Sequence, residues 1–136
     1  MNLVDTSGWI EYFFAGPNAA YFAQPIEDAK HLLVPTVCLY EVFKKVNLVG
    51  NHAQALHAVA QMREAEVVTL TDNVALSAAL VSLKYGLPMA DSMIYATALA
   101  WQSTLWTQDD HFARLPGVNF KKASASTPGA QPPSVN

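Results

Sequence analysis

The stretch Leu3-Val4-Asp5-Thr6-Ser7-Gly8-Trp9-Ile10 decides the fold. Its first residues form a short apolar run before a turn signal, as in a brief buried strand. Asp5, Thr6 and Ser7 then offer the oxygen-bearing side chains that cap helix N-termini, so a helix is expected to begin near Trp9. A strand that passes directly into a helix is the first half of a βα unit.

The same alternation of short apolar strands and longer helical stretches continues along the chain. Strands are predicted at residues 2–4, 31–34, 67–70 and 104–106, with a fifth near 118–120. Further helices are expected at residues 19–29, 36–49, 52–64, 72–84 and 89–101. This alternation predicts an α/β fold with a central, mainly parallel sheet of four to five strands.

The predicted helix 72–84 is apolar on two sides. Val74, Ala78, Val81 and Tyr85 form one stripe at helical spacing, and Leu76, Leu80, Leu83 and Leu87 form a second. A helix with two apolar stripes is either deeply buried or meets a partner.

Composition narrows the class of protein. A hydrophobic fraction of 51% in 136 residues is ample for one packed domain and argues against a disordered chain. No apolar run reaches the ~20 residues of a membrane-spanning helix, and the N-terminus lacks the basic region of a signal peptide, so a cytoplasmic protein is expected. From Ala123 onward aromatic and charged residues disappear, so we expect a domain over 1–122 and a disordered tail over 123–136.

Four acidic residues stand near the ends of predicted strands or at helix starts. Asp5 follows the first strand, and Asp109 comes shortly after the strand at 104–106. Glu41 lies about one turn into the helix after the second strand, and Asp91 falls in the first turn of the last helix. Ligands of parallel α/β sheets bind beyond the carboxyl ends of the strands, so these carboxylates are expected at one edge.

Such a cluster indicates a cation. Two carboxylates 4 Å apart repel by about 4 kcal/mol at an effective dielectric constant of about 20. Hard divalent ions such as Mg²⁺ prefer oxygen ligands and remove this repulsion, and a metal-bound water is a nucleophile for hydrolysis. Taken singly, each acid is better explained as a solvated or helix-capping residue; their apolar sequence neighbours favour a functional role.

Neither the net charge nor the cysteine content identifies a substrate. The net charge of −3 argues mildly against nucleic-acid binding. With the four metal-site acids set aside, however, seven acidic residues remain against eight basic ones, so RNA is neither favoured nor excluded. Cys38, the only cysteine, cannot form an internal disulfide, and its apolar neighbours indicate a buried thiol rather than a nucleophile.

Four stretches resemble the motifs of PIN-domain proteins, specifically the toxin ribonucleases of VapBC toxin–antitoxin pairs. Residues 3–10 resemble the opening strand that ends in Asp-Thr/Ser-Ser, and residues 35–42 resemble the helix that carries a glutamate. Residues 90–98 resemble the acidic helix start of the third motif, and residues 105–112 the closing Thr-x-Asp-x-x-Phe motif. The match runs in order over roughly residues 1–122.

This resemblance implies a three-layer α/β/α sandwich and a metal-dependent endoribonuclease that hydrolyses RNA phosphodiester bonds. The cofactor would be Mg²⁺, with Mn²⁺ as a possible substitute. It also implies a homodimer and inhibition by a cognate antitoxin protein. A PIN-fold module that binds RNA or protein without cutting is the alternative, and the presence of all four acids speaks against it.

The resemblance also assigns roles to residues. Asp5, Glu41 and Asp91 should be the catalytic metal ligands, with Asp109 as the fourth unless the adjacent Asp110 takes its place.

Ser7 and Thr107 are expected to orient the carboxylates by hydrogen bonds, although turn and helix capping explain them equally well. An Asp-nucleophile phosphatase ranks low, because such enzymes usually have a second Asp two residues on, where this chain has Ser7. His111 stands near the proposed site, where contact with substrate is one interpretation, and Lys44 and Lys45 are either phosphate contacts or solubilising charges.

Overall fold

The computed structural model describes residues 1–124. Apart from Ala123 and Ser124, the tail expected over 123–136 therefore lies outside the described residues. In chain order the elements are β1 (Asn2–Val4), α1 (Thr6–Phe13), α2 (Ala19–Ile26), η1 (Ala29–His31), β2 (Leu32–Pro35), α3 (Thr36–Val49), α4 (His52–Met62), β3 (Glu66–Val68), α5 (Asp72–Tyr85), α6 (Met89–Ala100), β4 (Thr104–Thr107), η2 (Asp110–Phe112) and β5 (Val118–Phe120).

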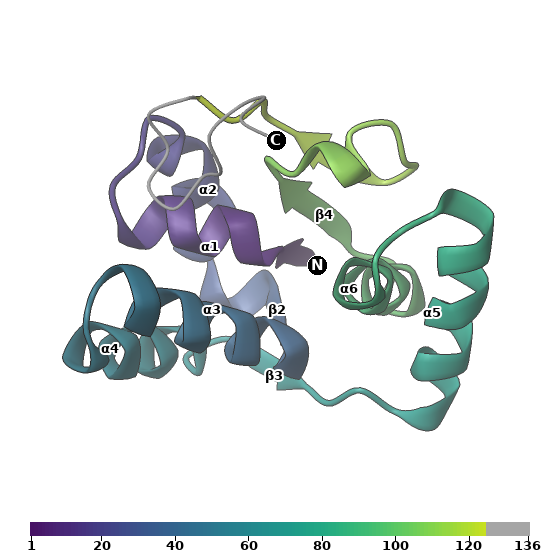
Figure 1. Cartoon of the computed structure of the whole chain (residues 1–136), viewed down its shortest axis with the longest axis horizontal. Helices are drawn as coiled ribbons and strands as arrows, with labels where there is room; N and C mark the ends of the chain where they lie inside the picture. Colours follow the sequence, from purple (N-terminus) through teal and green to yellow (C-terminus); the bar gives the residue numbers. More distant parts are fainter. Residues whose placement is uncertain (125–136) are drawn as a thin grey trace.

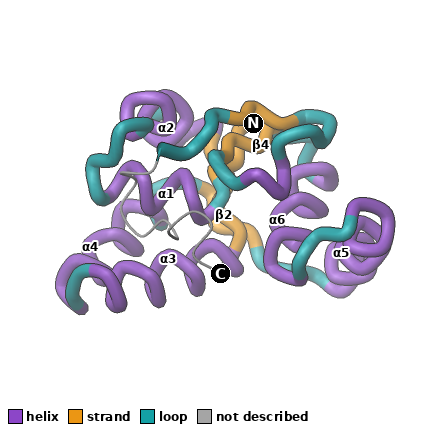
Figure 2. Tube along the Cα trace, turned by 45° about the horizontal axis from the view of Figure 1, so that its top comes forward, coloured by secondary structure: helices purple, strands orange, loops and turns teal. Residues whose placement is uncertain are grey.

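The five strands form one parallel sheet in the order β3-β2-β1-β4-β5. The chain steps from β1 to β2 to β3 in one direction and then returns across the sheet to β4. Because parallel crossovers are right-handed, this reversal places α1 to α4 on one face and α5 with α6 on the other. Figures 1 and 2 show these two groups of helices on opposite sides of the strands, which confirms the three-layer α/β/α prediction.

Most element boundaries follow local signals. Helix α1 begins at Thr6, earlier than the expected start near Trp9, because the Asp5 side chain accepts a hydrogen bond from the backbone N–H of Gly8 and caps the helix there. The second predicted helix stops at Ile26, and its last residues turn into the 3₁₀ segment η1. β3 covers residues 66–68 rather than 67–70, because its pairing with β2 sets its limits.

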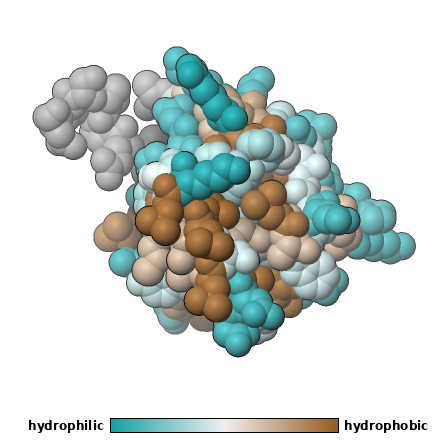
Figure 3. Space-filling view, turned by 90° about the vertical axis from the view of Figure 1, so that its right-hand side faces the viewer, coloured by the Kyte–Doolittle hydropathy of each residue, from teal (hydrophilic) through white to brown (hydrophobic). Residues whose placement is uncertain are grey.

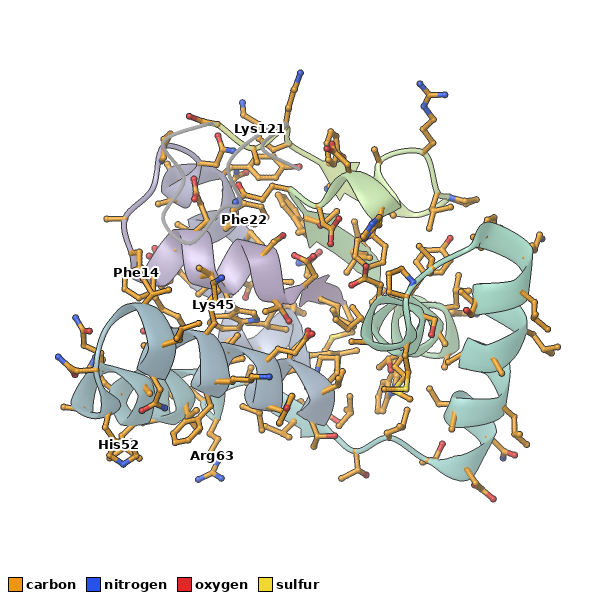
Figure 4. All side chains as sticks on the ribbon, in the orientation of Figure 1. Phe14, Phe22, Lys45, His52, Arg63 and Lys121 are labelled. Atoms are coloured by element: carbon orange, nitrogen blue, oxygen red, sulfur yellow. The ribbon has the colours of Figure 1, made fainter. Side chains whose placement is uncertain are left out.

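The layer of α1 and α2 packs closely on the central strand. A Cβ atom at Gly8 would lie 2.6 Å from side-chain atoms of Phe22 and Val4, so only glycine allows this approach. Phe22, labelled in Figure 4, is fully buried between α2 and the sheet. Burial of a phenylalanine of this kind stabilises a fold by roughly 2–3 kcal/mol.

On the opposite face α6 lies between the sheet and α5. α6 buries residues on nearly all sides, among them Ile94 and Tyr95, whereas α5 buries only Ala78. Val81 and Tyr85 of the first α5 stripe pack against the core, while Leu76, Leu80 and Leu83 of the second stripe are 68%, 68% and 83% exposed. Of the two interpretations of this helix, deep burial is therefore wrong.

Figure 3 views this side of the molecule and shows hydrophobic side chains gathered on it. Leu87, which continues the second stripe in sequence, lies beyond the end of α5 and is buried. None of the helices within residues 1–124 is long and apolar enough to cross a lipid bilayer.

Candidate metal centre

A cleft of about 930 Å³ opens at the carboxyl edge of the sheet. Asp5 leaves β1 and Asp109 follows β4, and these two strands are neighbours in the sheet. The chain turns in opposite directions along the sheet after these two strands, which makes this the switch point where ligands of open α/β sheets bind. Glu41 from α3 and Asp91 from α6 line the same cleft, so all four predicted acids share one surface.

Asp5 is the most deeply buried of these acids, with 2% of its surface exposed. Ser7 Oγ donates to its Oδ1 at 2.7 Å, and Thr107 Oγ1 donates to its Oδ2 at 2.8 Å. The backbone N–H of Gly8 donates to Oδ1 as well, at 3.1 Å. The carboxylate is therefore held in one orientation by donors to both oxygens. Ser7 and Thr107 therefore both donate to Asp5, the contact that their predicted role requires.

These donors do not compensate fully for burial. Loss of solvation raises the pKa of Asp5 from 3.8 to about 7, even though hydrogen bonds from Ser7, Thr107 and Gly8 lower it. The negative charge of Asp109 raises it further. A carboxyl group with such a perturbed pKa in a cleft is typical of a functional site.

Glu41 and Asp91 reach the cleft from opposite faces of the sheet. Thr6 Oγ1 donates to Oε1 of Glu41 at 2.6 Å, so the first residue of α1 fixes a side chain of α3. Asp91 is partly buried in the first turn of α6. Desolvation, and then the charge of Asp109, raise the pKa of Asp91, and the charge of Glu41 adds to the effect. The acids thus repel one another across the cleft.

The segment after β4 completes the cluster. The N–H of Asp109 donates to Thr107 Oγ1 at 2.9 Å, so one hydroxyl connects Asp109 to Asp5. The Asp109 side chain in turn caps η2 by accepting the N–H of His111 at 2.9 Å. Asp110 also lines the cleft, but it is exposed, and it is Asp109 whose oxygen lies close to Asp91 and His111.

The residues present fit a divalent cation. One ligand atom each from Asp91, Asp109 and His111 lie within 4.8 Å of one another. Over residues 1–124, the salt bridges to the four acids come from His111 alone, which lies 2.7 Å from Asp91 and 3.3 Å from Asp109. A metal ion would supply the positive charge that the remaining carboxylates lack.

The wall formed by α3 is basic and aromatic. Lys44 and Lys45 line the cleft beside Glu41, and Lys45, labelled in Figure 4, lies where α3 passes α1. Tyr40 is 63% exposed, with Lys44 Nζ 5.7 Å from its ring centre. Cations and an exposed aromatic ring beside the acids offer contacts for phosphates and bases.

Sequence reasoning missed three contributors. Thr6 was assigned only to helix capping, although its hydroxyl holds Glu41. Glu11 is fully buried, where its carboxylate accepts hydrogen bonds from the N–H of Asn18 at 2.6 Å and from Gln108 Nε2 at 3.4 Å, which anchors the segment leading to Asp109. His111 was noted only for substrate contact. Its place directly before Phe112, a buried core residue, was the signal that its backbone is fixed.

The predicted buried thiol is confirmed, because Cys38 is fully enclosed in the core. Its Sγ lies 4.0 Å from the carbonyl oxygen of Val4. Burial raises the pKa of this thiol well above its usual value, which makes the thiolate inaccessible near neutral pH. Cysteine chemistry therefore has no part in the site.

Comparison with solved structures shows several similar folds. A toxin–antitoxin complex from Klebsiella pneumoniae matches with a TM-score of 0.71 at 21% identity, over 88% of this chain and 96% of that one. VapC20 of Mycobacterium tuberculosis, a sarcin–ricin loop cleaving toxin, matches with a TM-score of 0.71 at 17% identity, over 83% and 94% of the two chains. DNA-bound VapBC from Salmonella typhimurium matches with a TM-score of 0.70 at 15% identity, over 90% and 98%.

At these identities the likeness concerns the fold. A search of curated proteins finds no match. The PIN domain family model matches residues 3–118, which span all five strands from Leu3 of β1 to the first residue of β5. The chain therefore belongs to the PIN domain family.

Proposed function

We propose that this chain is a metal-dependent endoribonuclease, the toxin of a VapBC-type toxin–antitoxin pair. The observation that carries the proposal is the convergence of Asp5, Glu41, Asp91 and Asp109 on one cleft of a PIN domain. Mutual repulsion of these acids and the burial of Asp5 give no benefit to folding. A bound divalent ion would offset both the repulsion among the acids and the buried charge of Asp5.

The four acids would hold the ion, Mg²⁺ or Mn²⁺ being suited to carboxylate oxygens. Such an ion, when bound, would supply an activated water for attack on phosphorus and would offset charge on the leaving oxygen. Ser7 and Thr107 keep both oxygens of Asp5 in place, and Thr6 does the same for Glu41. Because these carboxylates are oriented before substrate arrives, little reorganisation is needed during the reaction.

The α3 wall would hold the RNA. Lys44 and Lys45 lie beside the acids and can contact phosphates, and the exposed ring of Tyr40 can stack on an unpaired base. In the reaction a water oxygen bonds to phosphorus as the bond from phosphorus to the leaving ribose oxygen breaks. The products are two RNA fragments, one with a terminal phosphate and one with a terminal hydroxyl.

Two protein partners belong to the proposal. The exposed Leu76, Leu80 and Leu83 of α5 form an apolar face on an outer helix, which we assign to a homodimer interface. Monomeric domains rarely expose a contiguous apolar patch without an interaction that covers it. A cognate antitoxin is the second partner, since two of the solved structures with this fold are named as toxin–antitoxin assemblies.

A cleavage assay tests the enzyme proposal. Purified protein, free of any antitoxin, is incubated with total cellular RNA and Mg²⁺ or Mn²⁺, and the new RNA ends are sequenced. EDTA and Glu41→Gln should each lower cleavage at least ~100-fold. The Gln oxygen can still accept the Thr6 hydrogen bond, so the fold should be unaffected.

Glu64→Gln, at an exposed glutamate outside the cleft, is the matched control and should cut like the wild type. Cleavage that continues in EDTA would refute a metal-dependent nuclease. RNA that binds to the wild type but stays intact would favour the non-catalytic module instead.

A further inference from the structure

The side chain of His111 contacts two of the acidic residues of the cleft. The backbone of His111 is fixed, because its N–H donates to the capping side chain of Asp109 and the following Phe112 is fully buried. From this fixed position the Nδ1 atom lies 2.7 Å from Oδ2 of Asp91 and 3.3 Å from Oδ1 of Asp109. The imidazole thus joins the two acids that arrive from α6 and from the segment after β4.

These separations are those of neighbouring ligands around one ion. Ligands that bind at about 2.1 Å and at right angles to each other stand roughly 3 Å apart. The two nitrogen–oxygen distances, 2.7 and 3.3 Å, lie on either side of this value. A cation that enters between these groups therefore needs only small side-chain movements to be held by two oxygens and one nitrogen.

We propose that His111 is a nitrogen ligand of the metal centre and gives that centre a preference for later first-row transition ions such as Ni²⁺ over Mg²⁺. This inference rests on the proposed metal-dependent function and deepens it. Mg²⁺ is a hard ion that retains water and favours oxygen ligands, whereas imidazole binds transition ions such as Zn²⁺, Ni²⁺ and Fe²⁺ well. One imidazole in a carboxylate site therefore raises the affinity for transition ions relative to that for Mg²⁺.

Calorimetric titration of the metal-free protein with NiCl₂ and with MgCl₂ tests the ion preference directly, without any measurement of RNA cleavage. His111→Ala should weaken Ni²⁺ binding at least ~10-fold and change Mg²⁺ binding less than ~3-fold, because it removes one nitrogen ligand. The variant keeps the backbone N–H that donates to Asp109, and the side chain that it removes is 56% exposed, so the fold should be retained. Urea unfolding of both proteins checks this.

His31→Ala is the matched control, since His31 also lies 3.0 Å from a carboxylate, that of Asp28, but lines no part of the cleft. It should bind both ions like the wild type. In addition, ¹⁵N-labelled histidine shows ligation by NMR: Zn²⁺ should shift a ring nitrogen of His111 and leave the ring nitrogens of His31 in place.

Each other result overturns the inference in a recognisable way. Equal weakening of Ni²⁺ and Mg²⁺ binding by His111→Ala would mean that the ring only positions Asp91 and Asp109. Unchanged Ni²⁺ binding would mean that the ring has no part in the metal site. Either result leaves the proposed nuclease intact if cleavage remains sensitive to EDTA, whereas failure of the wild type to bind any divalent ion would refute both.

Discussion

Replacement of Asp5 by asparagine should stabilise the metal-free protein at alkaline pH and abolish RNA cleavage. The folded-state pKa of Asp5 is raised from 3.8 to about 7. The folded protein therefore holds a proton that the unfolded chain has lost, and Asp5 reduces stability as pH rises from about 4 to about 7. Above this range the ionised carboxylate costs about 4 kcal/mol relative to its neutral form, from about three pKa units at 1.36 kcal/mol each.

Asparagine is a close neutral substitute. Its amide oxygen can accept the hydrogen bonds from Gly8 and Ser7, and asparagine is as good a helix N-cap as aspartate. Its amide nitrogen faces Thr107, whose hydroxyl can rotate to accept. The substitution should therefore change the pH dependence of stability more than it changes the structure.

Urea unfolding in EDTA, near pH 5 and near pH 8, measures the effect. Near pH 5 the cost of Asp5 in the wild type is about 1–2 kcal/mol, so the advantage of Asp5→Asn should grow by about 2–3 kcal/mol between the two pH values. A contribution from altered hydrogen bonds that is the same at both pH values cancels in this difference. Saturating Mn²⁺ should stabilise the wild type and remove most of the advantage.

Parallel stability curves for the two proteins would refute the argument that buried charge at Asp5 is uncompensated. Glu64→Gln, at the exposed glutamate outside the cleft, is the control and should shift neither the relative pH dependence nor the cleavage rate. Cleavage at the wild-type rate by Asp5→Asn would remove Asp5 from the proposed catalytic site.

Two further substitutions test the hydrogen bonds that support the site and the exposed apolar face of α5. Thr107→Val removes the hydroxyl that donates to Asp5 and accepts the N–H of Asp109. Calorimetry should show metal binding weakened ~10-fold or more, and urea unfolding should show a loss of about 1–3 kcal/mol in the free energy of unfolding. Thr107→Ser should retain most of both, and equal effects of the two variants would contradict a role for the hydroxyl. Leu80→Glu, on the exposed face of α5, should convert a dimer to monomers in analytical ultracentrifugation at micromolar concentration, with RNA cleavage and unfolding as readouts of an intact fold. Unchanged sedimentation would exclude this face as the dimer interface.

The sequence alone determined the fold class and most of the elements. Short apolar runs and capping residues act over a few positions, so β1, α3 and β5 have the predicted limits within a residue or two. β3 was displaced because a short edge strand takes its limits from hydrogen bonding with its neighbour, β2. The two stripes of α5 were also visible in the sequence, but only packing against α6 shows which of them faces the core.

The candidate site divides in the same way. Acids such as Asp5 and Asp91 were recognisable because each interrupts an apolar stretch at a strand end or helix start. Their convergence follows from parallel pairing of β1 with β4 and from the crossover that brings α6 to the same edge. His111 contacts Asp91, which is 20 residues away in the sequence. The fully buried carboxylate of Glu11 contacts Gln108, which is 97 residues away. Local patterns carry no record of such distances, so only the tertiary structure decided them.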